Sequence, residues 1–430
     1  MWNIITKTSE VVVKLSIVIP ALNEEGNVVE LITALHKVVP SISPEYEILL
    51  VDGGSVDNTR DVAKRLKAKV IVQKGRGFGE ALREGFDAAQ GEHILTLDAD
   101  LSHSPTLIPQ MWEAREEAEI VVASRYVPGG SAEMPLMRKV LSRMLNKVFA
   151  TGLALPVKDL SSGFRLYKSS SLHNLALSSS DFDILQEILV KCYAQGWKTK
   201  ETPFHYLPRK GGDSHVRLLR FGISYLRTFR RMWRLRNSIL SADYDDRAFD
   251  SRIPLQRYWQ RRRYRIITDL ARGAKSTLDV GCGSSRILGG LEGGIGLDIQ
   301  LAKLRYIRGY GKPLVNASLY ALPFKESAFD CVVCSEVIEH LLPGEEPFLE
   351  MSRVLQRGGN LIIGTPDYAT FSWRLMERLY RFFAPGGYAE EHTTHYSKNG
   401  LIKFLQDRGF ALEEVHYVCH SEMILSFRKR

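Results

Sequence analysis

Residues 93–103 read HILTLDADLSH, a short apolar run that ends in two carboxylates. The run predicts a buried strand that stops at Asp98. Asp98 and Asp100 then stand at the carboxyl end of this strand, which is where open α/β sheets bind their ligands. Paired carboxylates there suit Mg²⁺ or Mn²⁺, which share their oxygen ligands with substrate diphosphates. Isolated Asp-x-Asp pairs also occur in surface turns, so the surrounding segments decide what this pair does.

The pattern around this stretch predicts a mostly parallel sheet. Strands are predicted at residues 15–19, 47–51, 70–72 and 93–97, with helical patterns from about Gly26 and over 58–66. Alternating strands and helices are typical of βαβ units. A second series begins at Ser276, with strands predicted at residues 277–280, 294–297, 331–334 and 360–363. The restart predicts two α/β domains, residues 1–236 and 237–430.

Composition narrows the class of protein. The 430 residues are 44% hydrophobic and 25% charged, which is ordinary for globular chains and excludes disordered, collagen-like and disulfide-scaffold classes. The net charge of +9 favours anionic partners such as phosphates, nucleic acids or acidic membranes. Five cysteines do not make a secreted framework. Because neither a signal peptide nor a run of roughly 20 apolar residues is evident, we expect a cytoplasmic protein without a transmembrane segment.

Two basic segments lie between the predicted domains. Residues 216–236 alternate arginines with leucines and aromatic residues at helical spacing, which predicts a basic amphipathic helix. Such a helix either lies in a membrane interface or packs on its own domain with solvated arginines. Residues 252–265 are also basic, and their tyrosines and tryptophan favour packing over nucleic-acid binding.

Six segments of the first half occur in an informative order. They are PALNEE (20–25), VDGGS (51–55), GFGEA (77–81), DADLSH (98–103), SRY (124–126) and DLSSGFR (159–165). With these motifs, residues 14–230 resemble inverting family 2 glycosyltransferases of the GT-A fold, of the polyprenyl-phosphate (dolichyl-phosphate) mannosyltransferase type. The resemblance implies transfer of a hexose from a nucleotide sugar to polyprenyl or dolichyl phosphate. GDP-mannose is the usual donor of the family, and UDP-hexoses or N-acetylhexosamines stay open.

The resemblance also assigns roles to residues. Those for the nucleotide sugar are Pro20, Leu22, Glu24, Asp52, Asp98, Ala99, Asp100, Arg209 and His215. Those for the Mg²⁺ or Mn²⁺ ion are Asp98, Asp100 and Ser102, and those for the acceptor phosphate are Arg125, Arg138 and Ser142. Asp98, Asp100 and Arg125 are the catalytic set. A phosphate acceptor is already anionic and needs no general base, whereas an alcohol would need one. A lipid acceptor favours membrane contact through residues 216–236.

The second half carries a glycine-rich turn. Residues 278–285, LDVGCGSS, follow a predicted strand, and their glycines let a cofactor approach the backbone. Asp298 ends the next strand and suits ribose hydroxyls of a dinucleotide or of S-adenosylmethionine. Later segments are SLYALPF (318–324), FDCVV (329–333), SEVIEH (335–340) and RVLQRGG (353–359). With them, residues 242–430 resemble Rossmann-like class I S-adenosylmethionine-dependent methyltransferases. The resemblance places Asp279, Gly281 and Gly283 at the methionine part, Asp298 at the ribose and Ser318 at the adenine.

The SEVIEH segment suggests a second metal site. If it is helical, Glu336, Glu339 and His340 share one face. Some related O-methyltransferases hold a divalent cation with such a set, and His392 or His395 could add a ligand or base. The alternative is that this segment is the usual sequence of the family after this strand and holds no metal. Cys331 and Cys334 fall on a predicted strand, point to opposite faces and are predicted to be core residues.

The resulting interpretation is a bifunctional enzyme at the cytoplasmic face of a membrane. The first domain glycosylates a polyprenyl phosphate, and the second methylates a related glycan or lipid-linked intermediate. Two alternatives stay open. The second domain could be a non-catalytic module, because Ser285 and Ser318 replace a common Gly and Asp, or the chain could be a nucleic-acid methyltransferase that uses its basic segments. No nucleic-acid partner is expected.

Overall fold

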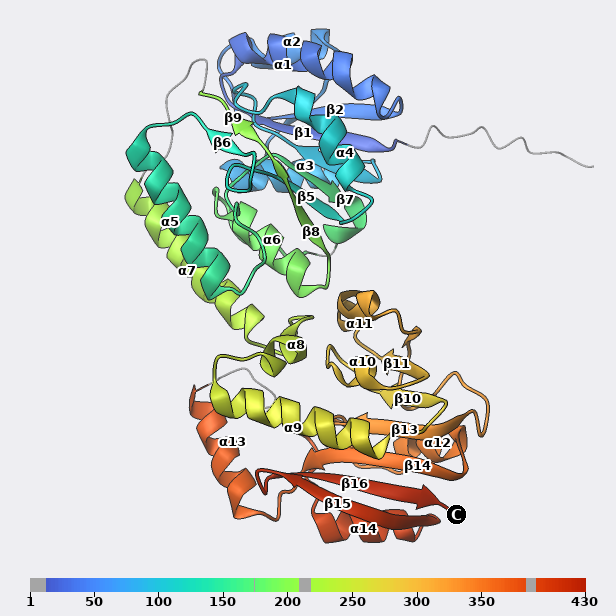
Figure 1. Ribbon diagram of the computed structural model, residues 1–430. Coiled ribbons are helices and arrows are strands. Elements are labelled where there is room, and N and C mark those ends of the chain that lie inside the picture. The colour runs from blue at the N-terminus through green and yellow to red at the C-terminus, as the bar shows by residue number, and fades with distance from the viewer. Residues whose placement is uncertain (1–12, 174, 209–217, 384–391) are drawn as a thin grey trace, which may run out of the picture. The chain divides into compact units, whose positions relative to one another are not determined.

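The computed structural model describes residues 13–173, 175–208, 218–383 and 392–430. They divide into two compact units (Figure 1). One holds the described residues up to Tyr193 with Trp197–Trp233, and the other holds Ala194–Gly196 with Arg234–Arg430. Helix α7 (Leu218–Arg236) contains the change from one unit to the other, near the boundary predicted after residue 236.

A seven-stranded sheet forms the first unit, in the order β3-β2-β1-β4-β7-β5-β8. Its strands are β1 (Leu15–Ala21), β2 (Tyr46–Asp52), β3 (Lys69–Val72), β4 (His93–Thr96), β5 (Ile120–Ser124), β7 (Arg165–Lys168) and β8 (Thr199–Pro203). Only β7 runs antiparallel to its neighbours, β4 and β5. The carboxyl ends of the other strands therefore meet at one edge of the sheet, where β7 begins. The first four strands lie where the sequence predicts them.

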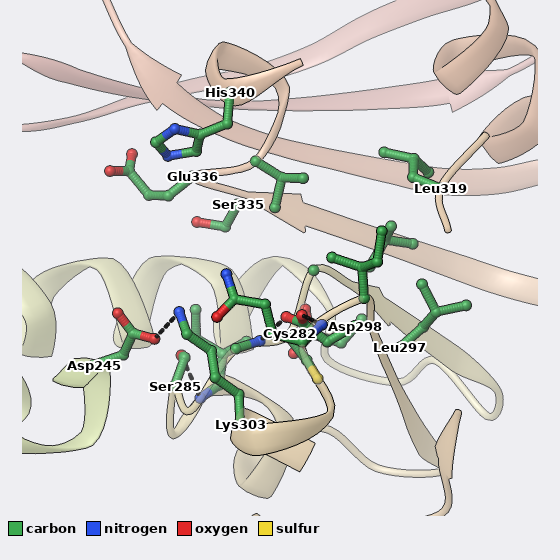
Figure 2. A pocket seen from close by; sticks show the side chains of 18 of the residues that line it. Asp245, Cys282, Ser285, Leu297, Asp298, Lys303, Leu319, Ser335, Glu336 and His340 are labelled. Carbon is green, nitrogen blue, oxygen red and sulfur yellow. Dashed lines mark hydrogen bonds and ion pairs between the residues drawn. The ribbon is translucent and has the colours of Figure 1, made fainter. Parts of the chain in front are cut away.

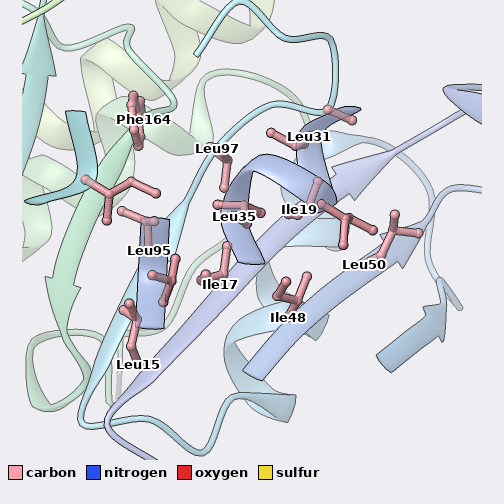
Figure 3. Packing of buried hydrophobic residues seen from close by; sticks show 14 of the residues in the cluster. Leu15, Ile17, Ile19, Leu31, Leu35, Ile48, Leu50, Leu95, Leu97 and Phe164 are labelled. Atoms are coloured by element: carbon pink, nitrogen blue, oxygen red, sulfur yellow. The ribbon is translucent and has the colours of Figure 1, made fainter. Parts of the chain in front are cut away.

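Helices cover both faces of this sheet. The helices of this unit are α1 (Glu25–Val38), α2 (Thr59–Arg65), α3 (Phe78–Ala88), α4 (Ile108–Ala114), α5 (Leu136–Gly152) and α6 (Ile184–Ala194), followed by α7. Alternate residues of β1, such as Ile17 and Ile19, pack with Leu31 and Leu35 of α1 in one apolar cluster (Figure 3). On the other face α3 lies so close that a Cβ on Gly85 would stand 2.3 Å from Cγ1 of Val18. A short pair of strands, β6 (Ser131–Ala132) and β9 (His205–Tyr206), lies outside the sheet.

The second unit has its own seven-stranded sheet, in the order β12-β11-β10-β13-β14-β16-β15. Its strands are β10 (Thr277–Val280), β11 (Gly294–Asp298), β12 (Leu314–Asn316), β13 (Phe329–Ser335), β14 (Leu355–Pro366), β15 (Phe410–Val418) and β16 (Glu422–Lys429). β16 is antiparallel to β14 and β15, and the remaining neighbours are parallel. This doubly wound arrangement confirms the predicted α/β class and includes all four strands predicted after Ser276.

The helices of the second unit are α8 (Tyr244–Phe249), α9 (Pro254–Leu270), α10 (Ile287–Gly290), α11 (Leu301–Ile307), α12 (Glu346–Val354), α13 (Phe371–Phe383) and α14 (Lys398–Gln406). Most of the basic segment 252–265 lies in α9, which packs through Ile266 and Ile267. Cys331 and Cys334 of β13 are buried in different apolar clusters, as expected for core residues on opposite faces. Over the residues described here, we find no helix that combines the length and the apolar character needed to span a bilayer.

Candidate active sites

The loops that leave β1 and β2 are joined at the ligand-binding edge of the first sheet. Asp52 ends β2 as a buried carboxylate, and it accepts hydrogen bonds from the backbone N–H groups of Gly54 and Ser55, both at 3.2 Å. Ser55 in turn accepts a 2.9 Å bond from the backbone N–H of Asn23, and Thr59 accepts one from Glu24. Asp52 and the backbone of Glu24, two of the residues predicted for the nucleotide, are thus tied into the loops that leave β2 and β1. The other two lie at the end of β1, Pro20 within the strand and Leu22 directly after it.

The acid pair follows β4 in a tight turn. Asp100 is buried and its Oδ1 accepts a 3.1 Å hydrogen bond from the backbone N–H of Ser102. Leu101 between them has φ +62°. The Ser102 hydroxyl oxygen is buried and has no hydrogen-bond partner among the described residues. A buried hydroxyl without a partner, two residues after Asp100, suits a divalent cation and its phosphate ligands, so Asp98, Asp100 and Ser102 fit the predicted metal site.

His103 supports this turn, although no role was predicted for it. Its Nδ1 accepts a 3.0 Å hydrogen bond from the backbone N–H of Asp98, so in the neutral ring the proton is on Nε2, 3.7 Å from Oδ2 of Asp98. Burial lowers the pKa of His103, because the charged ring would lose its hydration. The ring stacks on Phe164 at 5.2 Å between centroids. Its position three residues after Asp100 is the signal that was available in the sequence.

A buried ion pair lies at the same edge. Arg125 follows β5, and its Nε and Nη2 each donate a 2.7 Å hydrogen bond to the carboxylate of Asp159, in the loop before β7. Nη2 also donates to the hydroxyl of Ser161 at 2.7 Å. Although burial opposes both charges, these bonds raise the pKa of Arg125 and lower the pKa of Asp159. The predicted phosphate-binding arginine is therefore held in one orientation by Asp159, for which no role was predicted.

Helix α5 packs its polar side against this pair. The Tyr126 hydroxyl donates a 2.7 Å bond to the hydroxyl of Ser142, and the amide of Asn146 donates to Ser161 at 3.0 Å. Asn146 also accepts from the backbone N–H of Leu160 at 2.7 Å. Arg138 is exposed one turn before Ser142. Ser142 is thus joined to the Arg125 loop, and Arg138 stays a predicted acceptor contact. Arg209 and His215, the predicted donor contacts, lie outside the described residues.

A cavity of about 320 Å³ opens at the carboxyl edge of the second sheet (Figure 2). All five residues predicted for S-adenosylmethionine line it, namely Asp279, Gly281, Gly283, Asp298 and Ser318. Gly281 has φ +66°, and a Cβ there would stand 2.3 Å from Cγ2 of Val337. Gly283 has φ +56°, and its Cβ would stand 2.9 Å from Oδ2 of Asp245. Both glycines are therefore required by backbone conformation and by lack of space.

The two acids of this cavity differ in their partners. Asp298 accepts 2.8 Å and 2.7 Å hydrogen bonds from the backbone N–H groups of Gly283 and Gln300. Asp279 is buried, and its Oδ2 has no hydrogen-bond partner among the described residues. Burial, with a smaller contribution from Asp298, raises the pKa of Asp279 to about 8. An orphaned carboxylate suits a cationic ligand such as S-adenosylmethionine, so the residues present fit this cofactor.

The SEVIEH segment is not the helix that would align its three ligand candidates. Glu336 has φ +58°, and only Ile338–His340 form a 3₁₀ turn. Glu336 instead lies 3.2 Å from Nη2 of Arg263, which also pairs with the buried Glu422. Figure 2 shows Glu336 and His340 on one wall of the cavity, across from Asp245 and Lys303. The predicted i, i+3, i+4 face is therefore wrong, because a left-handed residue interrupts the turn.

A different set of ligand atoms comes together nearby. Side-chain atoms of Glu339, His340 and His392 lie within 4.8 Å of one another. The backbone N–H groups of Thr393 and Thr394 donate 2.8 Å and 3.0 Å bonds to the carbonyl of Glu339, which brings His392 to the turn. Glu339 Oε2 accepts from Thr365 at 3.0 Å, while its buried Oε1 has no partner among the described residues. These donors fit a divalent cation.

Comparisons with known proteins divide the chain in the same way. Residues 16–176 match the model of glycosyl transferase family 2, and residues 278–363 match a methyltransferase domain. An uncharacterised glycosyltransferase from Mycobacterium bovis is 30% identical over 201 residues, which are 47% of this chain and 88% of that protein. The chain belongs to glycosyl transferase family 2 through its N-terminal half, and its C-terminal half carries a methyltransferase domain. Both are families of enzymes.

Two further relatives bear on the first half. A dolichol-phosphate mannosyltransferase from Pyrococcus furiosus is 34% identical over 215 residues, or 47% of this chain. Glycosyltransferase AglJ from Haloferax volcanii is 34% identical over 188 residues, or 43% of this chain. The matched regions span 59% and 62% of the lengths of these two relatives.

Solved structures resemble each half at low identity. Glucosyl-3-phosphoglycerate synthase from Mycobacterium tuberculosis is 19% identical, with a TM-score of 0.43 over 54% of this chain and 86% of that protein. An S-adenosylmethionine-dependent methyltransferase from Thermotoga maritima is 19% identical, with a TM-score of 0.37 over 43% of this chain and 94% of that protein.

Proposed function

We propose that residues 1–236 form a domain that transfers a hexose, with mannose as the first candidate, from a nucleotide sugar to polyprenyl or dolichyl phosphate. The observation that carries this proposal is the meeting at one sheet edge of the Asp98–Asp100 pair and the buried Arg125–Asp159 pair. The carboxylates would bind the metal ion that holds the donor diphosphate, and the fixed arginine would bind the acceptor phosphate. This edge therefore offers a binding group for each of the two anionic substrates. The similarity to the Pyrococcus dolichol-phosphate mannosyltransferase supports the choice of acceptor.

The transfer needs positioning and charge stabilisation more than proton transfer. A phosphate oxygen of the acceptor bonds to the anomeric carbon, and the bond from that carbon to the diphosphate breaks, with its electron pair leaving on the nucleoside diphosphate. Mg²⁺ or Mn²⁺ held by Asp98, Asp100 and Ser102 would supply charge stabilisation at the leaving diphosphate. Asp52 and the β1 loop hold the nucleotide, with Ala99, Arg209 and His215 as further proposed donor contacts. Arg125, with Arg138 and Ser142, orients the attacking phosphate.

For residues 237–430 we propose methyl transfer from S-adenosylmethionine to a hydroxyl of a related glycan or lipid-linked intermediate. The cavity lined by Asp279, Gly281, Gly283, Asp298 and Ser318 carries this proposal. A divalent cation held by Glu339 and His340, with His392, would orient the acceptor hydroxyl. As the oxygen–methyl bond forms, the methyl–sulfur bond breaks and S-adenosylhomocysteine leaves, while the hydroxyl proton passes to a base, for which His395 is the proposed candidate. Glu336, which pairs with Arg263, is the weaker of the three ligand candidates predicted from the sequence. We place both reactions at the cytoplasmic surface of a membrane.

The first reaction is tested by incubating the full chain with short polyprenyl phosphates and labelled GDP-mannose, UDP-glucose or UDP-N-acetylglucosamine. Label that moves into lipid with one donor, and stays with the nucleotide when EDTA removes divalent cations, supports the proposal and names the donor. No lipid label with any donor rejects the polyprenyl acceptor.

A non-catalytic second domain is the competing proposal, because Ser318 and Ser285 replace residues common in methyltransferases. Calorimetric titration of the full chain with S-adenosylmethionine separates the two. Micromolar binding is expected for an active domain, whereas undetectable binding favours a scaffolding module.

A further inference from the structure

His103 is a polar ring enclosed by aromatic side chains in the first unit. It is only 2% exposed, and its ring stacks on that of Phe164 with 5.2 Å between the centres. The rings of Phe204 and Tyr206 meet it edge to face, with their centres 5.5 Å and 6.4 Å away. A phenylalanine would fill this space without the cost of burying a polar ring. Packing alone therefore does not require a histidine, and the contacts of its two nitrogens need an explanation.

Both nitrogens of this ring face one residue, Asp98. Nδ1 accepts a 3.0 Å hydrogen bond from the backbone N–H of Asp98, and Nε2 lies 3.7 Å from Oδ2 of its carboxylate. Since Nδ1 is used as an acceptor, the ring carries its proton on Nε2. At 3.7 Å the second contact is electrostatic, and it becomes a hydrogen bond when the carboxylate turns toward the ring. The ring thus holds the backbone of Asp98 and offers a donor to its side chain.

Gly163 leaves space beside the same carboxylate. A Cβ on Gly163 would stand 3.3 Å from Oδ1 of Asp98 and 3.8 Å from Cε1 of His103. The carbonyl of Gly163 accepts a 2.7 Å hydrogen bond from the hydroxyl of Thr96, the last residue of β4, and this bond fixes the approach of the two segments. The side chain of Asp98 is 30% exposed, so a ligand can reach it while His103 contacts it from within the protein.

The direction of this carboxylate matters because Asp98 is a proposed ligand of Mg²⁺ or Mn²⁺. Such cations take oxygen ligands at short distances, and Mg²⁺ demands near-ideal octahedral geometry. A carboxylate that turns freely must be ordered when the cation binds, which costs conformational entropy. Hydrogen-bond partners behind metal ligands are typically worth about 10- to 100-fold in metal affinity. A donor that holds Asp98 in advance would therefore strengthen cation binding.

We propose that His103 is a positioning residue for the cation of the sugar-transfer site, and that its Nε2–H directs the carboxylate of Asp98. His103 itself binds neither the cation nor a substrate and acts through Asp98. This role rests on the proposed cation site at Asp98, Asp100 and Ser102, and it adds to that site a residue for which no role was predicted.

Three variants separate the two contacts of the ring. His103→Gln can place an amide N–H where Nε2 lies, whereas His103→Asn can place an amide oxygen only where Nδ1 lies. We expect His103→Asn to weaken Mn²⁺ binding by about tenfold or more, and His103→Gln to stay within about threefold of wild type. His103→Phe keeps a stacked ring without any nitrogen, and it should lose about as much affinity as His103→Asn.

The measurement is Mn²⁺ binding to the full chain, followed by electron paramagnetic resonance in the presence of GDP or UDP. The part of the binding that Asp100→Asn abolishes defines the site of the first unit and separates it from Mn²⁺ bound elsewhere in the chain. His36→Asn is the matched control, because His36 also uses both ring nitrogens, on the hydroxyl of Tyr46 at 2.6 Å and the carbonyl of Leu66 at 2.9 Å. It should bind Mn²⁺ as wild type does.

The variants are compared at a temperature at which circular dichroism shows each of them folded. Wild-type affinity in His103→Asn and His103→Phe overturns the proposal. Equal losses in His103→Asn and His103→Gln also overturn it, because the turn rather than the direction of the carboxylate would then govern binding. If Mn²⁺ affinity changes as expected but no polyprenyl phosphate accepts sugar, only the proposed function fails. Absence of nucleotide-dependent Mn²⁺ binding in wild type rejects the cation site and this role of His103 with it.

Discussion

Two buried carboxylates, one in each unit, show how differently the two sites are built. Asp159 lies at the ligand edge of the first sheet and is paired with Arg125, which lowers its pKa. Asp279 lies at the ligand edge of the second sheet, and its Oδ2 has no hydrogen-bond partner among the described residues. Burial raises the pKa of Asp279 to about 8. The carboxylate of Asp159 therefore has its partner within the first unit, which holds Arg125 in one orientation. Oδ2 of Asp279 has no such partner among the described residues, and a cationic ligand would supply one.

The largest effect is expected at the cation site of the first unit. Asp100→Asn should lower the rate of sugar transfer about 10³-fold, because the metal and the leaving diphosphate lose a charged ligand. Initial rates with labelled donor measure it, and Asp61→Asn, an exposed acid on α2, should keep the wild-type rate. A rate within threefold of wild type for Asp100→Asn would place the cation elsewhere.

Breaking the ion pair should cost stability as well as activity. Asp159→Asn leaves Arg125 buried without a charged partner and should lower the free energy of unfolding by about 3–5 kcal/mol. Calorimetry that resolves the transition of the first unit measures the loss. Arg125→Met/Asp159→Leu should cost less than Asp159→Asn, since neither charge remains. If Arg125→Met/Asp159→Leu is less stable than Asp159→Asn, the loss of stability in Asp159→Asn does not come from an unpaired charge.

Crowding at the glycine loop should weaken cofactor binding. Gly281→Ala places a methyl group 2.3 Å from Val337 and should reduce affinity for S-adenosylmethionine about tenfold or more. Titration calorimetry measures the affinity. Gly273→Ala is the matched control, because Gly273 also has a positive φ, +85°, but has open space around it. Equal losses in both variants would assign the effect to backbone strain alone.

The raised pKa of Asp279 should make the stability of the second unit depend on pH. The pKa of Asp279 rises from 3.8 when unfolded to about 8 when folded, so the native state binds the extra proton. The stability contributed is present below about pH 4 and is lost as pH rises toward 8, by up to about 1.4 kcal/mol per pH unit. Without cofactor, the melting temperature of this unit should fall over pH 5 to 8 more steeply in wild type than in Asp279→Asn. Parallel curves would mean that Asp279 already has a partner.

The strand pattern and the motifs predicted the sheets and brought most candidate residues to the correct edges. Parallel strands place their carboxyl ends together, so Asp98 and Asp279 could be located from spacing alone. The pairing of Arg125 with Asp159 could not, since the two residues are 34 positions apart and meet only through the register of β5 and β7. The positive φ of Glu336 could not be predicted either, because the identity of a non-glycine residue does not indicate a left-handed conformation.

Helices α5 and α7, which are both rich in basic residues, show the same limit of prediction from sequence. The many arginines of residues 216–236 led to the prediction of a membrane contact there. Part of α7 is buried, however, including Tyr225 and Met232. Six apolar side chains of α5 have the spacing of a core-facing helix, and only the structure shows that they are exposed: Leu136, Met137, Val140, Leu141, Met144 and Val148. Sequence periodicity predicts that a helix has an apolar face, and tertiary packing decides whether that face is covered.

The most direct test of the central claim is to compare polyprenyl phosphate with the matching polyprenol as acceptors for the full chain, with the donor that gives label. We predict transfer to the phosphate alone, because the proposed role of Arg125 is to bind an anion and an anionic acceptor requires no general base. Transfer to the polyprenol at a comparable rate would contradict this account of the first site.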